Sequence, residues 1–224
     1  YGTDINIGRI GLNWKGEVDI RDVYIADHHN DTLIYAQELQ TNVISFQNLI
    51  KGDLGFGNIH LQHAKLYVKT YKGEESDNLY VFSEKFNTGQ KSTNPFSLFS
   101  NDVRLTDSKV TITDENAETP EILNLTNVNL FAKSFRIDDT DVTAQIEALS
   151  LDANRGFSIK KLQTDFTYTL EKMELKELLL ETGGSTLKGN LLFSYGEAGL
   201  SDFVDGVTIN AKLDESQLAT NDLN

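Results

Sequence analysis

One spacing of apolar residues repeats along this chain and limits the folds that the chain can adopt. Each copy places apolar residues at relative positions 0, 2, 5 and 7, so one double gap lies between two single gaps. On a helix these positions would point at roughly 0°, 200°, 140° and 340°, which are opposite faces. On a strand they share a face if a β-bulge adds one residue at the double gap. The repeat therefore predicts bent strands, and bends in register would curve the whole sheet.

The apolar positions of these copies are expected to share one face of the sheet. They are Ile5, Ile7, Ile10, Leu12, Val18, Ile20, Val23, Ile25, Ile59, Leu61, Leu66, Val103, Leu105, Val110, Leu123, Leu125, Val128, Leu130, Ile146, Leu149, Leu151, Met173, Leu175, Leu178 and Leu180. The copy at Val103 has the polar Ser108 at one position, and it follows the Ile59 copy by 44 residues, so that Lys65 corresponds to Lys109.

The rest of the pattern predicts a mainly β chain of about a dozen strands in a curved, antiparallel-rich sheet. Polar residues between the apolar positions give each strand one wet face. Polar turns are expected at residues 28–31, 152–156 and 183–185, and short helical segments at 43–52 and 78–87. A polar loop reaching Pro95 suggests a strand–helix part at 1–95 and a repetitive β part at 96–224.

A sheet with one oily face must cover that face, since burying a large apolar side chain is worth ~1.5–3 kcal/mol. The sheet could form a sandwich, close as a barrel, or fold like a taco around a groove. The residue pattern alone favours the sandwich. A groove would need an apolar occupant, and acyl chains qualify because each buried CH₂ contributes about 0.8 kcal/mol.

Composition argues against several classes of function. The net charge of −14 disfavours nucleic acids and electrostatic docking on anionic membranes. Without cysteine there is no disulfide framework and no thiolate nucleophile. No stretch approaches the ~20 apolar residues of a membrane helix. The chain starts at Tyr1, and we interpret it as a piece of a longer protein.

No catalytic, metal or cofactor site is predicted. The histidines, which are His28, His29, His60 and His63, lie in a polar turn or on the wet side of a strand, and no converging carboxylate accompanies them in the sequence. We therefore interpret them as solvated surface residues. The acidic run at 138–141 lacks the glycine and the bidentate glutamate of a calcium loop. The glycines at 52–57 have the wrong order for a dinucleotide loop and suit a turn better.

At the level of ordered pattern, the chain resembles the AsmA-like and TamB (translocation and assembly module) proteins. The opening resembles their membrane-proximal region through INIGRIGLNWKGEVDIRDVYIAD and DTLIYAQELQTNVISFQNLIKGDLGFGNIHLQHAKLYVKTYKGE. The later MELKELLLETGGSTLKGNLLFSY resembles their repetitive β region. The long polar linkers are most similar to the TamB branch of Bacteroidota.

This resemblance implies an inner-membrane-anchored protein that crosses the periplasm of a Gram-negative bacterium as an apolar β-taco. Its implied partners are phospholipid acyl chains, the inner membrane through an N-terminal helix, and a TamA-like outer-membrane barrel through a C-terminal region. This chain carries neither of those two regions. The implied function is phospholipid transport to the outer membrane and assembly of outer-membrane proteins, without enzymatic activity and without a cofactor.

We therefore expect a segment whose repeat positions hold acyl chains, and whose passage of lipid is blocked by Leu149→Asp or Leu178→Asp more than its folding is harmed. The alternative is a sealed β-sandwich or adhesin-like binding module without a lipid conduit. A hydrolase with an unrecognised site is a third hypothesis, which generic esterase and glycosidase substrates would test.

Overall fold

The computed structural model describes residues 5–12, 18–43, 53–84, 97–117, 121–138, 141–154, 156–169, 171–194 and 207–219. The strands in these ranges are β1 (Ile5–Leu12), β2 (Val18–Ala26), β3 (Thr32–Val43), β4 (Asp53–Gln62), β5 (Lys65–Thr70), β6 (Ser97–Asp114), β7 (Glu121–Asp138), β8 (Asp141–Ala153), β9 (Ser158–Tyr168), β10 (Lys172–Glu181), β11 (Thr186–Ser194) and β12 (Thr208–Leu213). The helix α2 (Asn78–Glu84) joins β5 to β6. Within the described residues, no helix has the length and apolar character needed to span a membrane.

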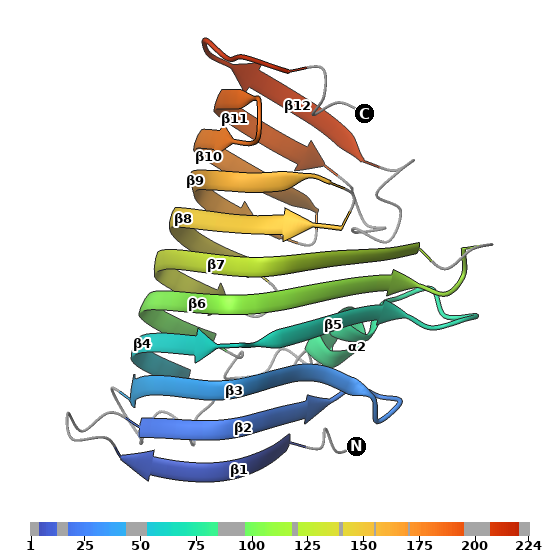
Figure 1. The fold of residues 1–224 in the computed structure, drawn as a ribbon, viewed down its shortest axis with the longest axis vertical. Helices are drawn as coiled ribbons and strands as arrows, with labels where there is room; N and C mark the ends of the chain where they lie inside the picture. Colours follow the sequence, from blue (N-terminus) through green and yellow to red (C-terminus); the bar gives the residue numbers. More distant parts are fainter. Residues whose placement is uncertain are drawn as a thin grey trace.

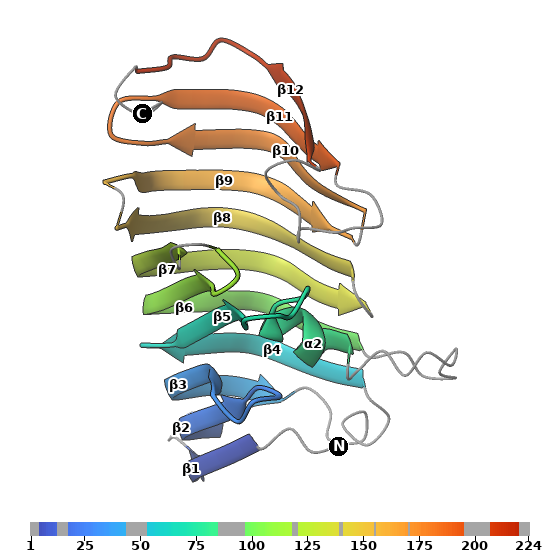
Figure 2. The same ribbon diagram turned by 90° about the vertical axis from the view of Figure 1, so that its right-hand side faces the viewer.

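All these strands belong to one 12-stranded sheet, in the order β1-β2-β3-β4-β6-β7-β8-β9-β10-β11-β12, with β5 pairing β3 and β6. The pairs are antiparallel except β4 with β6 and β5 with β6, which are parallel. The sheet is elongated and visibly curved (Figures 1 and 2). The expected mainly β, antiparallel-rich fold is confirmed. The described strands do not form the two packed sheets of a sandwich, which the residue pattern alone had favoured.

The double gap of the repeat is a β-bulge with a left-handed residue. Its second residue has a positive φ in copy after copy: Asp22 (54°), His63 (51°), Asp107 (47°), Asn127 (51°) and Glu177 (51°). One type of bulge places a residue in this region, and Asn, Asp and His enter it more readily than most side chains. The left-handed residue expected at such a bulge therefore lies at the predicted place in these strands.

Register shifts mark three of these places, at Asp107, Asn127 and Glu177. The pairing of β10 with β11 shifts between Leu175 and Leu178, across Glu177. The register of β7 with β8 also shifts at the double gap of β8, since Phe131 pairs with Ala148 while Ala132 pairs with Ile146. No residue of β8 has a positive φ. The copies in β1 and β2 are exceptions. The register of β1 with β2 is the same on both sides of Gly8, and the register of β2 with β3 is the same on both sides of Asp22, so no shift accompanies the double gap there.

The 44-residue offset between two copies is a parallel register. Every pair of β4 with β6 and of β5 with β6 has this offset, as in Lys65 with Lys109. The register is unchanged across the bulges because His63 and Asp107 are both left-handed and lie side by side. The His63 amide donates to the Thr106 carbonyl at 3.0 Å, and the Lys109 amide donates to the Ala64 carbonyl at 2.8 Å. Bends in adjacent strands therefore coincide, which curves the sheet as a unit.

The helix expected over 78–87 is confirmed for Asn78–Glu84 as α2, while 85–87 lie outside the described residues; turns lie at residues 28–31 and 183–185 as expected. The helical turn expected at 43–52 lies outside the described residues except for Val43, which ends β3. The loop proposed as a boundary near Pro95 also lies outside them. One sheet nevertheless runs through both parts of the chain, since β4 pairs with β6.

The left-handed bulge residue gives a stability test. We expect Glu177→Val to lower the free energy of unfolding by about 1–2 kcal/mol, because a β-branched side chain is strained at positive φ. The side chain of Glu177 is exposed, so little packing is lost. Urea denaturation measures the change. The neighbouring Lys176→Val, whose residue has no positive φ, is the control and should change stability by no more than about 0.5 kcal/mol. Equal effects of the two substitutions would contradict the assignment of strain to the bulge.

Candidate functional site: the apolar face of the sheet

A continuous row of leucine and isoleucine crosses the sheet along its long axis. Each member is the Cα partner of the next, and cross-strand partners point to the same face. We call this the apolar row, and it consists of Ile10, Ile20, Leu39, Leu61, Leu105, Leu130, Leu149, Leu162, Leu180 and Leu187. Strands lie ~4.8 Å apart, so the row from β1 to β11 is about 43 Å long.

Two further rows flank it on the same face. One consists of Leu98, Ile137, Val142, Tyr168, Met173, Phe193 and Ile209. The other, on the opposite side of the bulges, consists of Ile34, Leu66, Val110, Leu125 and Ala153. These three rows together are called the apolar face below. The register therefore joins separate repeat copies into one surface.

Burial on the apolar face is greatest near the bulges and falls toward the strand ends. Leu178, Val128 and Val103 are 3%, 5% and 8% exposed, because the bend crowds side chains from neighbouring strands. Ile112, near the end of β6, and Ile209, on β12, are 40% and 58% exposed. Apolar surface is thus accessible at the end of β6 and on β12, the last strand of the sheet.

The helix α2 lies on the same side of the sheet as the apolar face. Both views place it on the inner side of the curve, beside β5 (Figures 1 and 2). Burial raises the pKa of the Tyr168 hydroxyl, and the negative charge of Asp77 and the nearby Tyr80 raise it further. The Tyr168 side chain shares a face with Met173, so the action of these charges on it agrees with a helix that lies over the apolar face.

The structure places the predicted site residues as follows: Ile5, Ile7, Ile10 and Leu12 on β1; Val18, Ile20, Val23 and Ile25 on β2; Ile59 and Leu61 on β4; Leu66 on β5; Val103, Leu105 and Val110 on β6; Leu123, Leu125, Val128 and Leu130 on β7; Ile146, Leu149 and Leu151 on β8; Met173, Leu175, Leu178 and Leu180 on β10. Most are half-buried. On β1, Ile7 and Ile10 are 41% and 66% exposed, while the side chains of Ile5 and Leu12 are not among those described.

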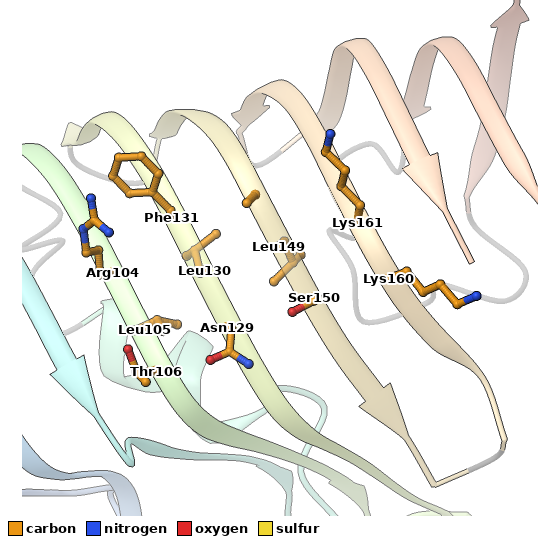
Figure 3. Close-up of a pocket in the computed structure, with 11 residues that line it drawn as sticks. Arg104, Leu105, Thr106, Asn129, Leu130, Phe131, Leu149, Ser150, Lys160 and Lys161 are labelled. Atoms are coloured by element: carbon orange, nitrogen blue, oxygen red, sulfur yellow. The ribbon is translucent and has the colours of Figure 1, made fainter. Parts of the chain in front are cut away.

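The face opposite the apolar face is polar and held by ion pairs. Lys133 Nζ lies 2.9 Å from Glu147 Oε1, and the Arg104 guanidinium lies 4.0 Å from the centre of the Phe131 ring. A hollow of about 270 Å³ lies across β6, β7, β8 and β9 and is lined by Arg104, Leu105, Thr106, Asn129, Leu130, Phe131, Ala148, Leu149, Ser150, Lys160 and Lys161 (Figure 3). Its lining combines three members of the apolar row, Leu105, Leu130 and Leu149, with the residues Arg104, Phe131 and Ala148 that alternate with them.

Three of the four histidines have hydrogen-bond partners that the sequence did not suggest. His28 Nε2 and His29 Nε2 lie 2.9 Å and 2.6 Å from the two carboxylate oxygens of Glu74. Hydrogen bonds from His29 and then His28 hold the pKa of Glu74 below its usual value. His60 Nε2 lies 3.0 Å from the hydroxyl oxygen of Thr106, and His63 is exposed at its bulge. The sequence analysis missed the converging carboxylate because Glu74 is 45 residues from His29 and carries no local signal.

The other motifs that the sequence analysis set aside have ordinary structural roles. Asp138 pairs with Arg136 at 3.0 Å and ends β7, while Asp139 lies outside the described residues. Gly55 lies within β4, which is not the strand-to-helix turn of a dinucleotide loop.

No protein-family model matches this chain, and no curated protein matches it significantly.

Proposed function

We propose that this chain is a lipid-holding segment whose apolar face accepts acyl chains. The observation that carries the proposal is the apolar row, which continues without a polar interruption from β1 to β11. A closed core can be packed without aligning its side chains along one axis. A long, linear apolar ligand needs an aligned row, because its binding free energy grows with the length over which it contacts apolar side chains.

The distribution of charge supports an apolar mode of binding. The chain carries a net charge of −14, so anionic headgroups gain nothing from general attraction to its surface. Each CH₂ buried on the apolar face would contribute about 0.8 kcal/mol, independent of the headgroup. Binding should therefore follow chain length more closely than headgroup chemistry.

Within the longer protein, we propose that the segment belongs to a periplasm-spanning protein of the TamB and AsmA-like type, in a Gram-negative bacterium. Its role would be non-enzymatic transport of phospholipid toward the outer membrane, in support of outer-membrane protein assembly. The support is the ordered resemblance of the sequence together with the curved single sheet and its one apolar face. In a protein of that type, the inner membrane and a TamA-like barrel would be contacted by other regions.

The test is direct. The 224-residue chain, expressed in a Gram-negative host and purified without detergent, is extracted with organic solvent and analysed by mass spectrometry. We expect co-extracted phospholipid, and displaceable binding of a fluorescent fatty acid whose affinity rises with chain length. Absence of both would contradict the proposal and favour a binding module without a lipid site.

A further inference from the structure

We propose that His28, His29 and Glu74 form a site for a divalent transition-metal ion, of which Zn²⁺ is the best fit. Their ligand atoms, one from each side chain, all lie within 4.8 Å of one another. The two histidines belong to the turn between β2 and β3, and Glu74 belongs to the connection after β5. The proposed site lies at the strand ends that carry these turns, and the inference is independent of the lipid proposal.

The distances suit replacement of two protons by one ion. Each imidazole Nε2 faces its own oxygen of the Glu74 carboxylate, at 2.9 Å and 2.6 Å. Zn²⁺ binds His nitrogen and carboxylate oxygen at about 2.0–2.2 Å, which in a tetrahedron separates ligand atoms by about 3.3 Å. To reach that separation, the Glu74 carboxylate would need to move away from the two imidazoles by less than about 1 Å. The side chains of His28, His29 and Glu74 are 22%, 43% and 32% exposed, so they have room for this movement.

Two of the three ligands, Glu74 and His29, are held in place before an ion binds. The Glu74 amide donates to the Tyr71 carbonyl at 3.0 Å, and the Glu74 carbonyl accepts from Asn116 Nδ2 at 2.8 Å. The His29 ring lies on the Tyr71 ring, with 3.8 Å between their centres, and the His29 amide donates to Asp27 Oδ1 at 2.9 Å. A ligand set with fixed side chains loses less entropy when it binds.

The surroundings favour a cation. The carboxylates of Asp27 and Asp31 accept hydrogen bonds from the hydroxyl of Tyr71, whose ring lies beside the two imidazoles. The ammonium group of Lys69 is close to Tyr71, but it lies 2.8 Å from Glu115, which offsets its charge. The carboxylates here outnumber the ammonium groups, so the local field attracts a divalent ion.

Imidazole and carboxylate ligands select among ions. Imidazole suits Zn²⁺, Cu²⁺ and Ni²⁺, whereas Ca²⁺ and Mg²⁺ require oxygen ligands. Three protein ligands leave a fourth position for water. Among the described residues, His28 Nδ1 has no hydrogen-bond partner, so the outer support that usually strengthens a ligating histidine is incomplete. We therefore expect reversible binding rather than a permanently held ion.

The experiment uses the whole chain after treatment with a chelator. Isothermal titration with Zn²⁺ in a non-coordinating buffer should show one saturable site per chain. The absorption spectrum of the Co²⁺ form should have the intense visible bands of tetrahedral coordination. His29→Gln and Glu74→Gln keep a hydrogen-bonding group but remove a ligand, so each should weaken binding about tenfold or more.

The control is His63→Asn, since asparagine tolerates the left-handed conformation of this exposed bulge residue. It should bind Zn²⁺ like the parent protein, and His28→Gln provides a third ligand variant if another is poorly folded. Absence of saturable binding overturns the proposal. So does binding that survives both His29→Gln and Glu74→Gln, or that is lost equally in His63→Asn, because the ion would then be held elsewhere on the acidic surface.

Discussion

Asp27→Ala is expected to lower the free energy of unfolding by about 3 kcal/mol, because it removes a buried charge that satisfies several donors. Asp27 is 4% exposed. Its Oδ2 accepts from the Tyr71 hydroxyl at 2.7 Å and from Asn78 Nδ2 at 2.8 Å. Its Oδ1 accepts from the amides of His29 and Asp31 at 2.9 Å and 3.0 Å. This single side chain therefore ties the β2–β3 turn to the start of α2.

The pKa of Asp27 is consistent with this role. Burial by itself would raise the pKa, but the hydrogen bonds from Asn78, Tyr71 and the two amides outweigh it and hold the pKa below its usual 3.8. The carboxylate is thus ionised at neutral pH. Its loss would leave a buried amide and a buried hydroxyl with fewer acceptors.

Urea denaturation of Asp27→Ala and of its control, Asp31→Ala, measures the effect. The Asp31 carboxylate accepts from the same Tyr71 hydroxyl at 2.9 Å, but its side chain is 63% exposed, so water can replace it. We expect its removal to cost less than about 1 kcal/mol. A cost below 1 kcal/mol for Asp27→Ala as well would show that the network does not stabilise the fold.

Leu149→Asp is expected to weaken binding of an acyl-chain probe by about tenfold or more, since it places a carboxylate in the middle of the apolar row. Leu149 is paired on both sides within the row, with Leu130 and Leu162. An acyl chain lying along the row would have to cross the new charge. Because Leu149 is only half-buried, we expect the protein to stay folded.

The matched control is Ala148→Asp, which adds the same charge on the same strand. Ala148 is exposed and lies one residue away, on the opposite face. Fluorescent fatty-acid binding and co-extracted lipid should be unchanged in Ala148→Asp and reduced in Leu149→Asp, with circular dichroism showing both folded. Equal loss in the two variants would point to net charge rather than the apolar face. Leu178→Asp is a poorer test than the sequence suggested, because Leu178 is 3% exposed and its replacement would also damage the fold.

The repeat spacing predicted the bent strands correctly because alternation and bulges are local properties. Alternate residues of a strand face the same side of the sheet. After a double gap, one extra residue in the left-handed region brings the next apolar side chain back to that side. Asp107 and Asn127 carry this signal in their own residue type and position. The 44-residue offset of Lys65 and Lys109 also contained the parallel register, although only the coordinates showed that these copies are neighbours.

The histidine site shows where such reasoning stops. His28 and His29 were visible as adjacent residues in a turn, but Glu74 becomes their partner only because the chain returns to this edge after β5. The same return brings Asn78 to Asp27 over 51 residues. No local spacing encodes such pairs, since they depend on the path between elements.

Bulged strands with one apolar face could be predicted from the residue pattern, because each of these features depends only on neighbouring residues. The tertiary structure alone decided that a single sheet carries all described strands, that α2 lies on its concave side, and that the repeat copies align into one continuous row. These depend on strand pairing and chain crossover between distant residues, whose free energy is set by packing and loop closure over the whole chain.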